Sequence, residues 1–134
     1  MPVSFFDSNV LLYLASSDAA KADRAEAMLV EGGAISVQVL NEITNVARRK
    51  MHMSWADTHT FLSTLQGVLV VHALTVETHD MGLKLAERYG LAVYDAMIAA
   101  SALQAGCDTL WSEDMQHGLM LDSLRILNPF RPTA

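Results

Sequence analysis

Short apolar runs alternate along the chain with longer segments in which apolar residues recur every three or four positions. The short runs are typical of buried strands, and the periodic segments are typical of helices that bury one face. The runs predict strands at residues 3–6, 34–35, 68–71, 109–111 and 124–127. The periodic segments predict helices at residues 10–15, 19–30, 37–50, 55–66, 76–89 and 94–105. This alternation indicates an α/β fold with a central parallel sheet of four to five short strands, covered by helices on both faces.

Capping and turn residues set the expected ends of these helices. Ser54 and Thr75 each precede a periodic segment, where a side-chain oxygen can accept a backbone N–H of the first helical turn. Glycine favours conformations that interrupt a helix, so Gly67 and Gly90 are expected to end the helices that contain or precede them.

The segment YDAMIAASAL at residues 94–103 is almost wholly apolar, with one carboxylate, Asp95, in its first turn. A helix that is apolar on nearly every side is a buried helix. An acid near a helix N-terminus is favoured by the peptide dipole, but an unpaired charge at the edge of a core is costly. We therefore expect a positive group to meet Asp95.

Length and charge narrow the class of protein. The chain has 134 residues, which predicts a single domain at 1–134, and 51% of them are hydrophobic. The net charge of −6 argues against a protein that binds nucleic acid through its overall charge. Metal ions and a local basic patch can still hold phosphates. The single cysteine, Cys107, fits a reducing, cytoplasmic setting. Neither a signal peptide nor an apolar stretch of about 18 residues is visible, so no membrane span is expected.

Three further acids are placed near the same edge of the predicted sheet as Asp95. Asp7 directly follows the first strand, and Asp114 follows the fourth strand after two residues. Ligands of parallel sheets bind outside the carboxyl ends of the strands, so both acids reach one edge. Glu42 borders the apolar stripe of the helix at 37–50.

Each acid alone also has a structural interpretation. Asp7 can cap the following helix, Glu42 can extend past the edge of the core, Asp95 can interact with the helix dipole, and Asp114 can belong to a turn. Four converging carboxylates, however, repel one another unless cations bind, and hard divalent metals prefer oxygen ligands. Mg²⁺ or Mn²⁺ at such a site supports phosphodiester hydrolysis. The sequence contains no P-loop, no G-x-S-x-G and no H-E-x-x-H motif, which removes several other classes of enzyme.

Four segments together resemble the successive motifs of the PIN domain family, and more narrowly those of VapC-type toxins. They are FDSNVLLY at 6–13, VLNE at 39–42, YDAMIAA at 94–100 and LWSEDM at 110–115. The resemblance extends from Val3 to about Asn128. It implies a three-layer α/β/α sandwich and a ribonuclease that depends on Mg²⁺ or Mn²⁺.

The resemblance also implies roles for individual residues. Asp7 and Asp95 match the most direct metal ligands, and Glu42 and Asp114 match acids that complete the shell or hold waters. Two polar residues match positions that support the first and last acids by hydrogen bonding, namely Asn9 and Ser112. Gln116 stands where many relatives carry a further acid, so the number of metal ions stays open. The implied partners are RNA, a second copy of the chain and a small VapB-like antitoxin that often inserts a basic side chain among the acids.

Two other functions stay open at this point. One is a PIN-like scaffold that only binds proteins, and the other is a phosphoacceptor receiver domain. A receiver needs an acceptor Asp after the third strand and a Lys after the fifth, but the chain has His72-Ala73 and Asn128-Pro129 there. The sequence also leaves open which RNA is cut. It does not assign a role to the basic residues that end the helix at 37–50, which are Arg48, Arg49 and Lys50, or to His117 near Asp114.

Overall fold

The computed structural model describes residues 3–131 and contains a six-stranded, mostly parallel sheet in the order β3-β2-β1-β4-β6-β5. The strands are β1 (Ser4–Phe6), β2 (Ala34–Ser36), β3 (Val70–His72), β4 (Thr109–Trp111), β5 (Met120–Leu121) and β6 (Leu124–Leu127). Only β5 is antiparallel to its neighbour, β6. The α/β class is thus confirmed, with one strand more than expected.

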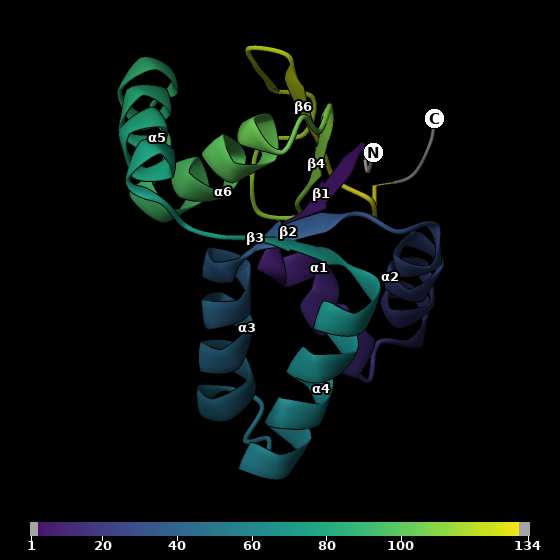
Figure 1. The fold of residues 1–134 in the computed structure, drawn as a ribbon. Coiled ribbons are helices and arrows are strands. Elements are labelled where there is room, and N and C mark those ends of the chain that lie inside the picture. Colours follow the sequence, from purple (N-terminus) through teal and green to yellow (C-terminus); the bar gives the residue numbers. More distant parts are fainter. Residues whose placement is uncertain (1–2, 132–134) are drawn as a thin grey trace.

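Helices cover both faces of the sheet, as the alternating pattern predicts (Figure 1). In the view of Figure 1, α1 to α4 lie below β2 and β3, and α5 and α6 lie above these two strands and to the left of β4 and β6. The bounds are α1 (Ser8–Leu12), a 3₁₀ turn η1 (Tyr13–Ala15), α2 (Ala19–Glu31), α3 (Val37–Arg49), α4 (Trp55–Val68), α5 (Val76–Tyr89) and α6 (Val93–Gln104). Within residues 3–131, no helix has both the length and the apolar character needed to cross a bilayer.

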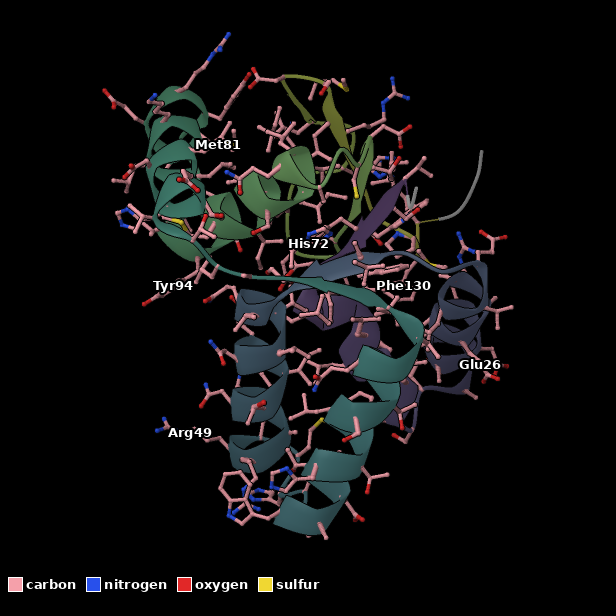
Figure 2. The ribbon with its side chains drawn as sticks, viewed as in Figure 1. Glu26, Arg49, His72, Met81, Tyr94 and Phe130 are labelled. Atoms are coloured by element: carbon pink, nitrogen blue, oxygen red, sulfur yellow. The ribbon has the colours of Figure 1, made fainter. Side chains whose placement is uncertain are left out.

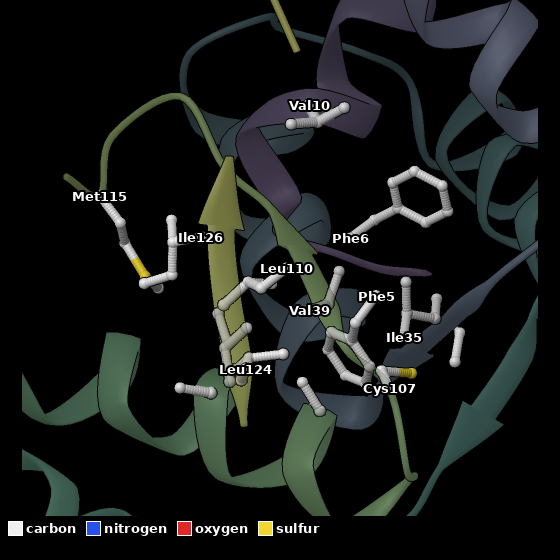
Figure 3. Packing of buried hydrophobic residues seen from close by; sticks show 14 of the residues in the cluster. Phe5, Phe6, Val10, Ile35, Val39, Cys107, Leu110, Met115, Leu124 and Ile126 are labelled. Atoms are coloured by element: carbon white, nitrogen blue, oxygen red, sulfur yellow. The ribbon is translucent and has the colours of Figure 1, made fainter. Parts of the chain in front are cut away.

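The core forms around the central strands β1 and β4 (Figure 3). Phe5 pairs with Ala34 on one side and with Leu110 on the other, and all three are fully buried. The apolar helix α6 is buried without interruption from Ala96 to Ala102, which confirms the expectation for that segment. Because these strands are buried on both faces, each shows a continuous apolar run that ends where the chain leaves the sheet.

One predicted helix end was wrong, and one strand was missed. Gly67 does not end its helix: α4 continues to Val68, and β3 begins at Val70. A glycine inside a helix costs only about 1 kcal/mol relative to alanine, and burial of Leu65 and Leu69 on the same helix end outweighs it. The strand β5 was not predicted, because two residues are too few to show an alternating pattern.

Candidate functional site

Asp7 lies at the carboxyl end of β1 and is only 2% exposed. Its Oδ1 accepts a 2.7 Å hydrogen bond from Ser8 N, so the side chain caps α1, as its structural interpretation expected. Its Oδ2 accepts from Ser112 Oγ at 2.8 Å and from Asn9 Nδ2 at 3.1 Å. Burial raises the pKa of Asp7 from 3.8 to about 6, against the lowering effect of the bonds from Ser112 and Ser8. The charges of Glu42 and Asp95 raise it further.

Asn9 and Ser112 both contact Asp7, and both also shape the segment that carries Asp114. Asn9 Oδ1 accepts from the backbone N–H of Glu113 at 3.0 Å, and Ser112 Oγ accepts from that of Met115 at 3.2 Å. The bend after β4 is thus fixed to the residues around the end of β1. The resemblance implied that Asn9 and Ser112 support the first and last acids. In the structure both donate to Asp7, and both accept from backbone amides next to Asp114.

Glu42 is held in place by two side chains that the sequence analysis did not single out. Ser8 Oγ donates to Glu42 Oε1 at 2.8 Å and lies 3.4 Å from Asp7 Oδ1, so one hydroxyl lies between two carboxylates. Gln38 Nε2 donates to Glu42 Oε2 at 3.0 Å from one turn earlier on α3. The four-residue spacing of Gln38 and Glu42 was a readable signal, whereas the contact with Ser8 depends on how α1 packs against α3.

Asp95 and Asp114 complete the group of acids. Asp95 lies in the first turn of α6 and is partly buried, and Asp114 is exposed in the bend after β4. Burial raises the pKa of Asp95, and the charges of Glu42 and Asp114 add to the rise. We call Asp7, Glu42, Asp95 and Asp114 the acidic group. Each of its members is coupled electrostatically to at least one other.

The positive partner expected for Asp95 is not found in the part of the chain that the structure describes. The ion pairs between residues 3 and 131 join Lys21 to Glu113, His79 to Asp80 and Arg88 to Asp122, and none includes a member of the acidic group. The repulsion within the group is therefore not relieved by a lysine or arginine at ion-pair distance.

The acidic group fits a hard divalent cation in the chemistry of its donors, because all four side chains are carboxylates. Within residues 3–131, however, no three His, Cys, Asp or Glu side chains are already arranged to hold one ion. Binding by three of them therefore requires side chains to move. Without a cation, the carboxylates of the acidic group repel one another and are kept apart. A bound cation would attract all of them and offset this repulsion.

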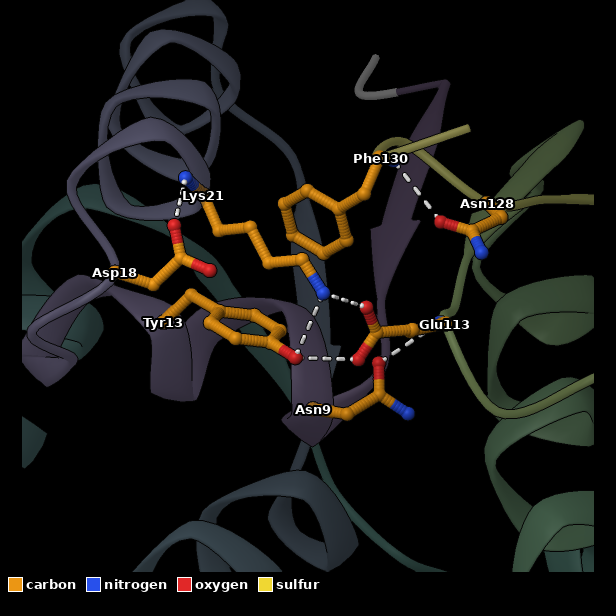
Figure 4. A network of polar contacts seen from close by, with 7 residues as sticks. All are labelled: Asn9, Tyr13, Asp18, Lys21, Glu113, Asn128 and Phe130. Carbon is orange, nitrogen blue, oxygen red and sulfur yellow. Dashed lines mark hydrogen bonds and ion pairs between the residues drawn. The ribbon is translucent and has the colours of Figure 1, made fainter. Parts of the chain in front are cut away.

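A second polar cluster, which the sequence analysis missed, joins Lys21 and Tyr13 to Glu113, the residue that precedes Asp114 (Figure 4). Lys21 Nζ lies 2.6 Å from Glu113 Oε2, and the Tyr13 hydroxyl donates to Glu113 Oε1 at 2.6 Å. Burial raises the pKa of Glu113, but the hydrogen bonds from Lys21 and Tyr13 and the charge of Lys21 together lower it below its ordinary value. A cavity of about 590 Å³ opens beside this cluster and is lined by Asn9, Tyr13, Met51 and Glu113 among others.

The basic residues at the end of α3 differ in their surroundings. Arg48 donates to the backbone carbonyl of Met53, and its guanidinium lies 4.2 Å from the centre of the Trp55 ring, so it links α3 to the start of α4. Arg49 and Lys50 are exposed, and Arg49 projects outward from α3 (Figure 2). His117 Nδ1 accepts from the backbone N–H of Asn128 at 2.9 Å, which gives this histidine a structural contact.

Solved structures that share this fold include a toxin–antitoxin complex and a toxin. The toxin–antitoxin complex from Klebsiella pneumoniae aligns with a TM-score of 0.74 at 18% identity, over 96% of this chain and 99% of that one. VapBC2 from Rickettsia felis, bound to a DNA fragment from its promoter, aligns with a TM-score of 0.68 at 18% identity, over 93% and 97%. VapC20 from Mycobacterium tuberculosis, a toxin that cleaves the sarcin–ricin loop, aligns with a TM-score of 0.61 at 16% identity, over 83% and 89%. At these identities the likeness establishes the fold.

The sequence itself gives the family. No curated protein matches this chain. The model of the PIN domain, however, matches residues 4–118, a range that begins in β1 and ends beyond the bend with Asp114. The chain therefore belongs to the PIN domain family.

Proposed function

We propose that this protein is a divalent-metal-dependent endoribonuclease and the toxin of a VapBC-type pair. The observation that supports this most strongly is the acidic group at the carboxyl edge of the sheet, in which Asp7 is buried and has a pKa raised to about 6. A buried carboxylate next to other carboxylates is costly for stability alone, so its presence favours a role in binding a cation.

The residues of the acidic group would hold Mg²⁺ or Mn²⁺, with Asp7 and Asp95 as the most direct ligands and Glu42 and Asp114 completing the set. When bound, the ion supplies a Lewis acid for the phosphodiester and makes hydroxide accessible at neutral pH. Ser112 and Asn9 keep the Asp7 carboxylate oriented through their bonds to Oδ2. Ser8 and Gln38 do the same for Glu42.

The proposed partners follow from the family and from the structures that share the fold. One similar structure is a toxin that cleaves the sarcin–ricin loop, and two contain toxin–antitoxin pairs. By extension, we propose that this protein cuts RNA, binds a VapB-like antitoxin and forms a homodimer in the cytoplasm. The absence of an ion pair to the acidic group within residues 3–131 suits an antitoxin that supplies a basic side chain there.

Cleavage of RNA by purified variants tests the proposal. Wild-type protein with Mg²⁺ or Mn²⁺ should cut RNA, and EDTA should abolish the cut. Asp7→Asn and Asp95→Asn keep the shape of the side chain and remove its charge, so each should lower the rate by at least about 100-fold. Asp80→Asn, which changes an exposed acid on α5, is the matched control and should cut at the wild-type rate. Wild-type rates in both site variants would refute the assigned roles.

A scaffold that binds proteins without catalysis is the second candidate, and membership of the PIN family removes the receiver domain from consideration. A scaffold would predict folded wild-type protein that neither cuts RNA nor gains stability from Mn²⁺. Burial, and secondarily the charges of neighbouring acids, raise the pKa values of Asp7 and Asp95. This favours the enzyme, because a scaffold gains nothing from carboxylates whose charged form is so costly.

A further inference from the structure

We propose that Lys21, Tyr13 and Glu113 form a clamp that fixes the bend carrying Asp114 and thereby raises the affinity of the acidic group for a divalent cation. The three residues are positioning residues, since none belongs to the acidic group. The inference rests on the proposed function, because it assigns these contacts a role at the proposed metal site.

The clamp occupies both oxygens of the Glu113 carboxylate. Lys21 Nζ lies 2.6 Å from Oε2, the Tyr13 hydroxyl lies 2.6 Å from Oε1, and Lys21 Nζ also donates to the Tyr13 hydroxyl at 3.2 Å. The side chains of Lys21 and Glu113 are 34% and 24% exposed. This pair is therefore better shielded from solvent and salt than an ordinary surface ion pair, which contributes little.

Aromatic rings hold the lysine in this position. Lys21 Nζ lies 4.7 Å from the centre of the Tyr13 ring and 5.2 Å from that of Phe130, and the two rings meet edge to face with their centres 4.9 Å apart. Lys21 comes from α2, Tyr13 from η1 and Phe130 from the segment after β6. Tyr13 and Lys21, which lie on consecutive elements, thus meet the side chain of Glu113 about 100 residues further along the chain, and Phe130 packs against both of them (Figure 4).

The clamp is connected to the acidic group through the backbone of the bend. Glu113 stands between Ser112, which bonds to Asp7, and Asp114. Its own N–H donates to Asn9 Oδ1, and Asn9 Nδ2 donates to Asp7. The Asp114 side chain makes no hydrogen bond or ion pair within residues 3–131, so its position depends on the backbone that carries it. A fixed Glu113 therefore limits where the Asp114 carboxylate can lie.

Mn²⁺ binding, measured by calorimetry on the full chain, tests the link to the metal site. Lys21→Met should weaken Mn²⁺ binding by about 10-fold, the size expected when a group that orients a ligand is removed. Glu113→Gln should do the same, and combining the two changes should add little, because both break one contact. Lys21→Arg keeps the charge and should restore much of the affinity. Arg88→Met removes a positive charge and an ion pair on α5, far from the clamp in sequence, and should bind Mn²⁺ as the wild type does.

Hydrogen exchange of the metal-free protein tests the clamp without using activity or metal. The amide of Glu113 donates to Asn9 Oδ1 on α1, and the amide of Met115 donates to Ser112 Oγ within the bend. Their exchange should be about 10-fold faster in Lys21→Met and in Glu113→Gln, and unchanged in Arg88→Met. Lys21→Met and Glu113→Gln are both used so that the test remains possible if one of them does not fold.

The outcomes separate the clamp from the proposed function. Wild-type exchange and wild-type Mn²⁺ affinity in both clamp variants would overturn the inference. Faster exchange with unchanged Mn²⁺ affinity would overturn the link between the clamp and the metal site. If the wild-type protein itself bound no Mn²⁺, the proposed function would fail, and the link between the clamp and the metal site would fail with it. The exchange experiment would still test the clamp, because unchanged exchange in the variants would show that the bend does not depend on Lys21.

Discussion

The Ser112 hydroxyl donates a 2.8 Å hydrogen bond to Asp7 Oδ2 across 105 residues of sequence. Both residues are buried, and they lie just past the ends of the adjacent parallel strands β4 and β1. The bond stabilises the charged form of Asp7 in a place where burial disfavours it. This hydrogen bond therefore contributes both to the stability of the fold and to the charge state of the site, and removing it should affect both.

Ser112→Ala removes this donor and leaves Asp7 less well solvated. The free energy of unfolding should fall by about 1.5–3 kcal/mol at pH 8, where Asp7 is charged, and by less at pH 5, where it is largely neutral. Urea unfolding at the two pH values measures the difference. Ser123→Ala, in the exposed turn between β5 and β6, is the control and should change little at either pH. Equal losses at pH 5 and pH 8 would mean that Ser112 does not stabilise the charge.

The raised pKa of Asp7 predicts how the stability of the metal-free protein depends on pH. In the folded state the pKa is about 6, against 3.8 for an ordinary aspartate, so between these values the folded protein binds more protons than the unfolded chain. The free energy of unfolding therefore falls as the pH rises from about 4 to about 6, and the contribution of Asp7 to this fall is roughly 3 kcal/mol. Asp7→Asn should remove this contribution.

The measurement compares the wild type with Asp7→Asn at each pH, because other groups titrate in the same range. The difference in the free energy of unfolding should shift in favour of the variant as the pH rises to 7. A difference that stays constant from pH 4 to pH 7 would contradict a raised pKa at Asp7.

Gly33 directly precedes β2 and lies so close to β1 that a side chain does not fit. Its replacement should therefore destabilise the fold. A Cβ at this position would lie 2.5 Å from Cε2 of Phe6 and 2.9 Å from the backbone oxygen of Ser4. Gly33→Ala should lower the free energy of unfolding by about 2 kcal/mol or more, because one of the two close neighbours is backbone that cannot move alone. Thermal or urea unfolding measures the effect.

Gly67→Ala is the matched control and should have the opposite sign. Gly67 is exposed near the end of α4, and a Cβ there would have no atom within 4 Å apart from its chain neighbours and the nearby backbone of its own helix. Alanine in a helix is more stable than glycine by about 0.5–1 kcal/mol, so this variant should be stabilised. Destabilisation by Gly67→Ala would argue against the continuation of α4 to Val68.

Much of the site follows from rules that act locally along the sequence. Asp7 comes directly after an apolar run and Asp114 two residues after another, and parallel strands bring such positions to one edge. Asp95 begins the most apolar helix, so its place at the border of the core was readable as well. The positions of the acids were thus predictable, while their assignment as metal ligands still depends on the resemblance to PIN domains.

The contacts that orient the acids were not predictable in the same way. Lys21 and Glu113 are 92 residues apart, and neither stands in a spacing pattern that points to the other. Their meeting depends on how α2 packs beside the bend after β4. Gly67 illustrates the opposite case, in which a correct local tendency was outweighed by burial of the neighbouring leucines.

The most direct test of the account is the thermal stability of wild-type protein and of Asp95→Asn, titrated with Mn²⁺ at pH 7.5. If the acidic group binds the ion, Mn²⁺ at about 100 times its dissociation constant should stabilise the wild type by about 2.7 kcal/mol. Asp95→Asn should lose most of this gain while it remains folded. A wild-type protein whose melting temperature does not change up to millimolar Mn²⁺, or a variant that gains as much as the wild type, would contradict the central claim.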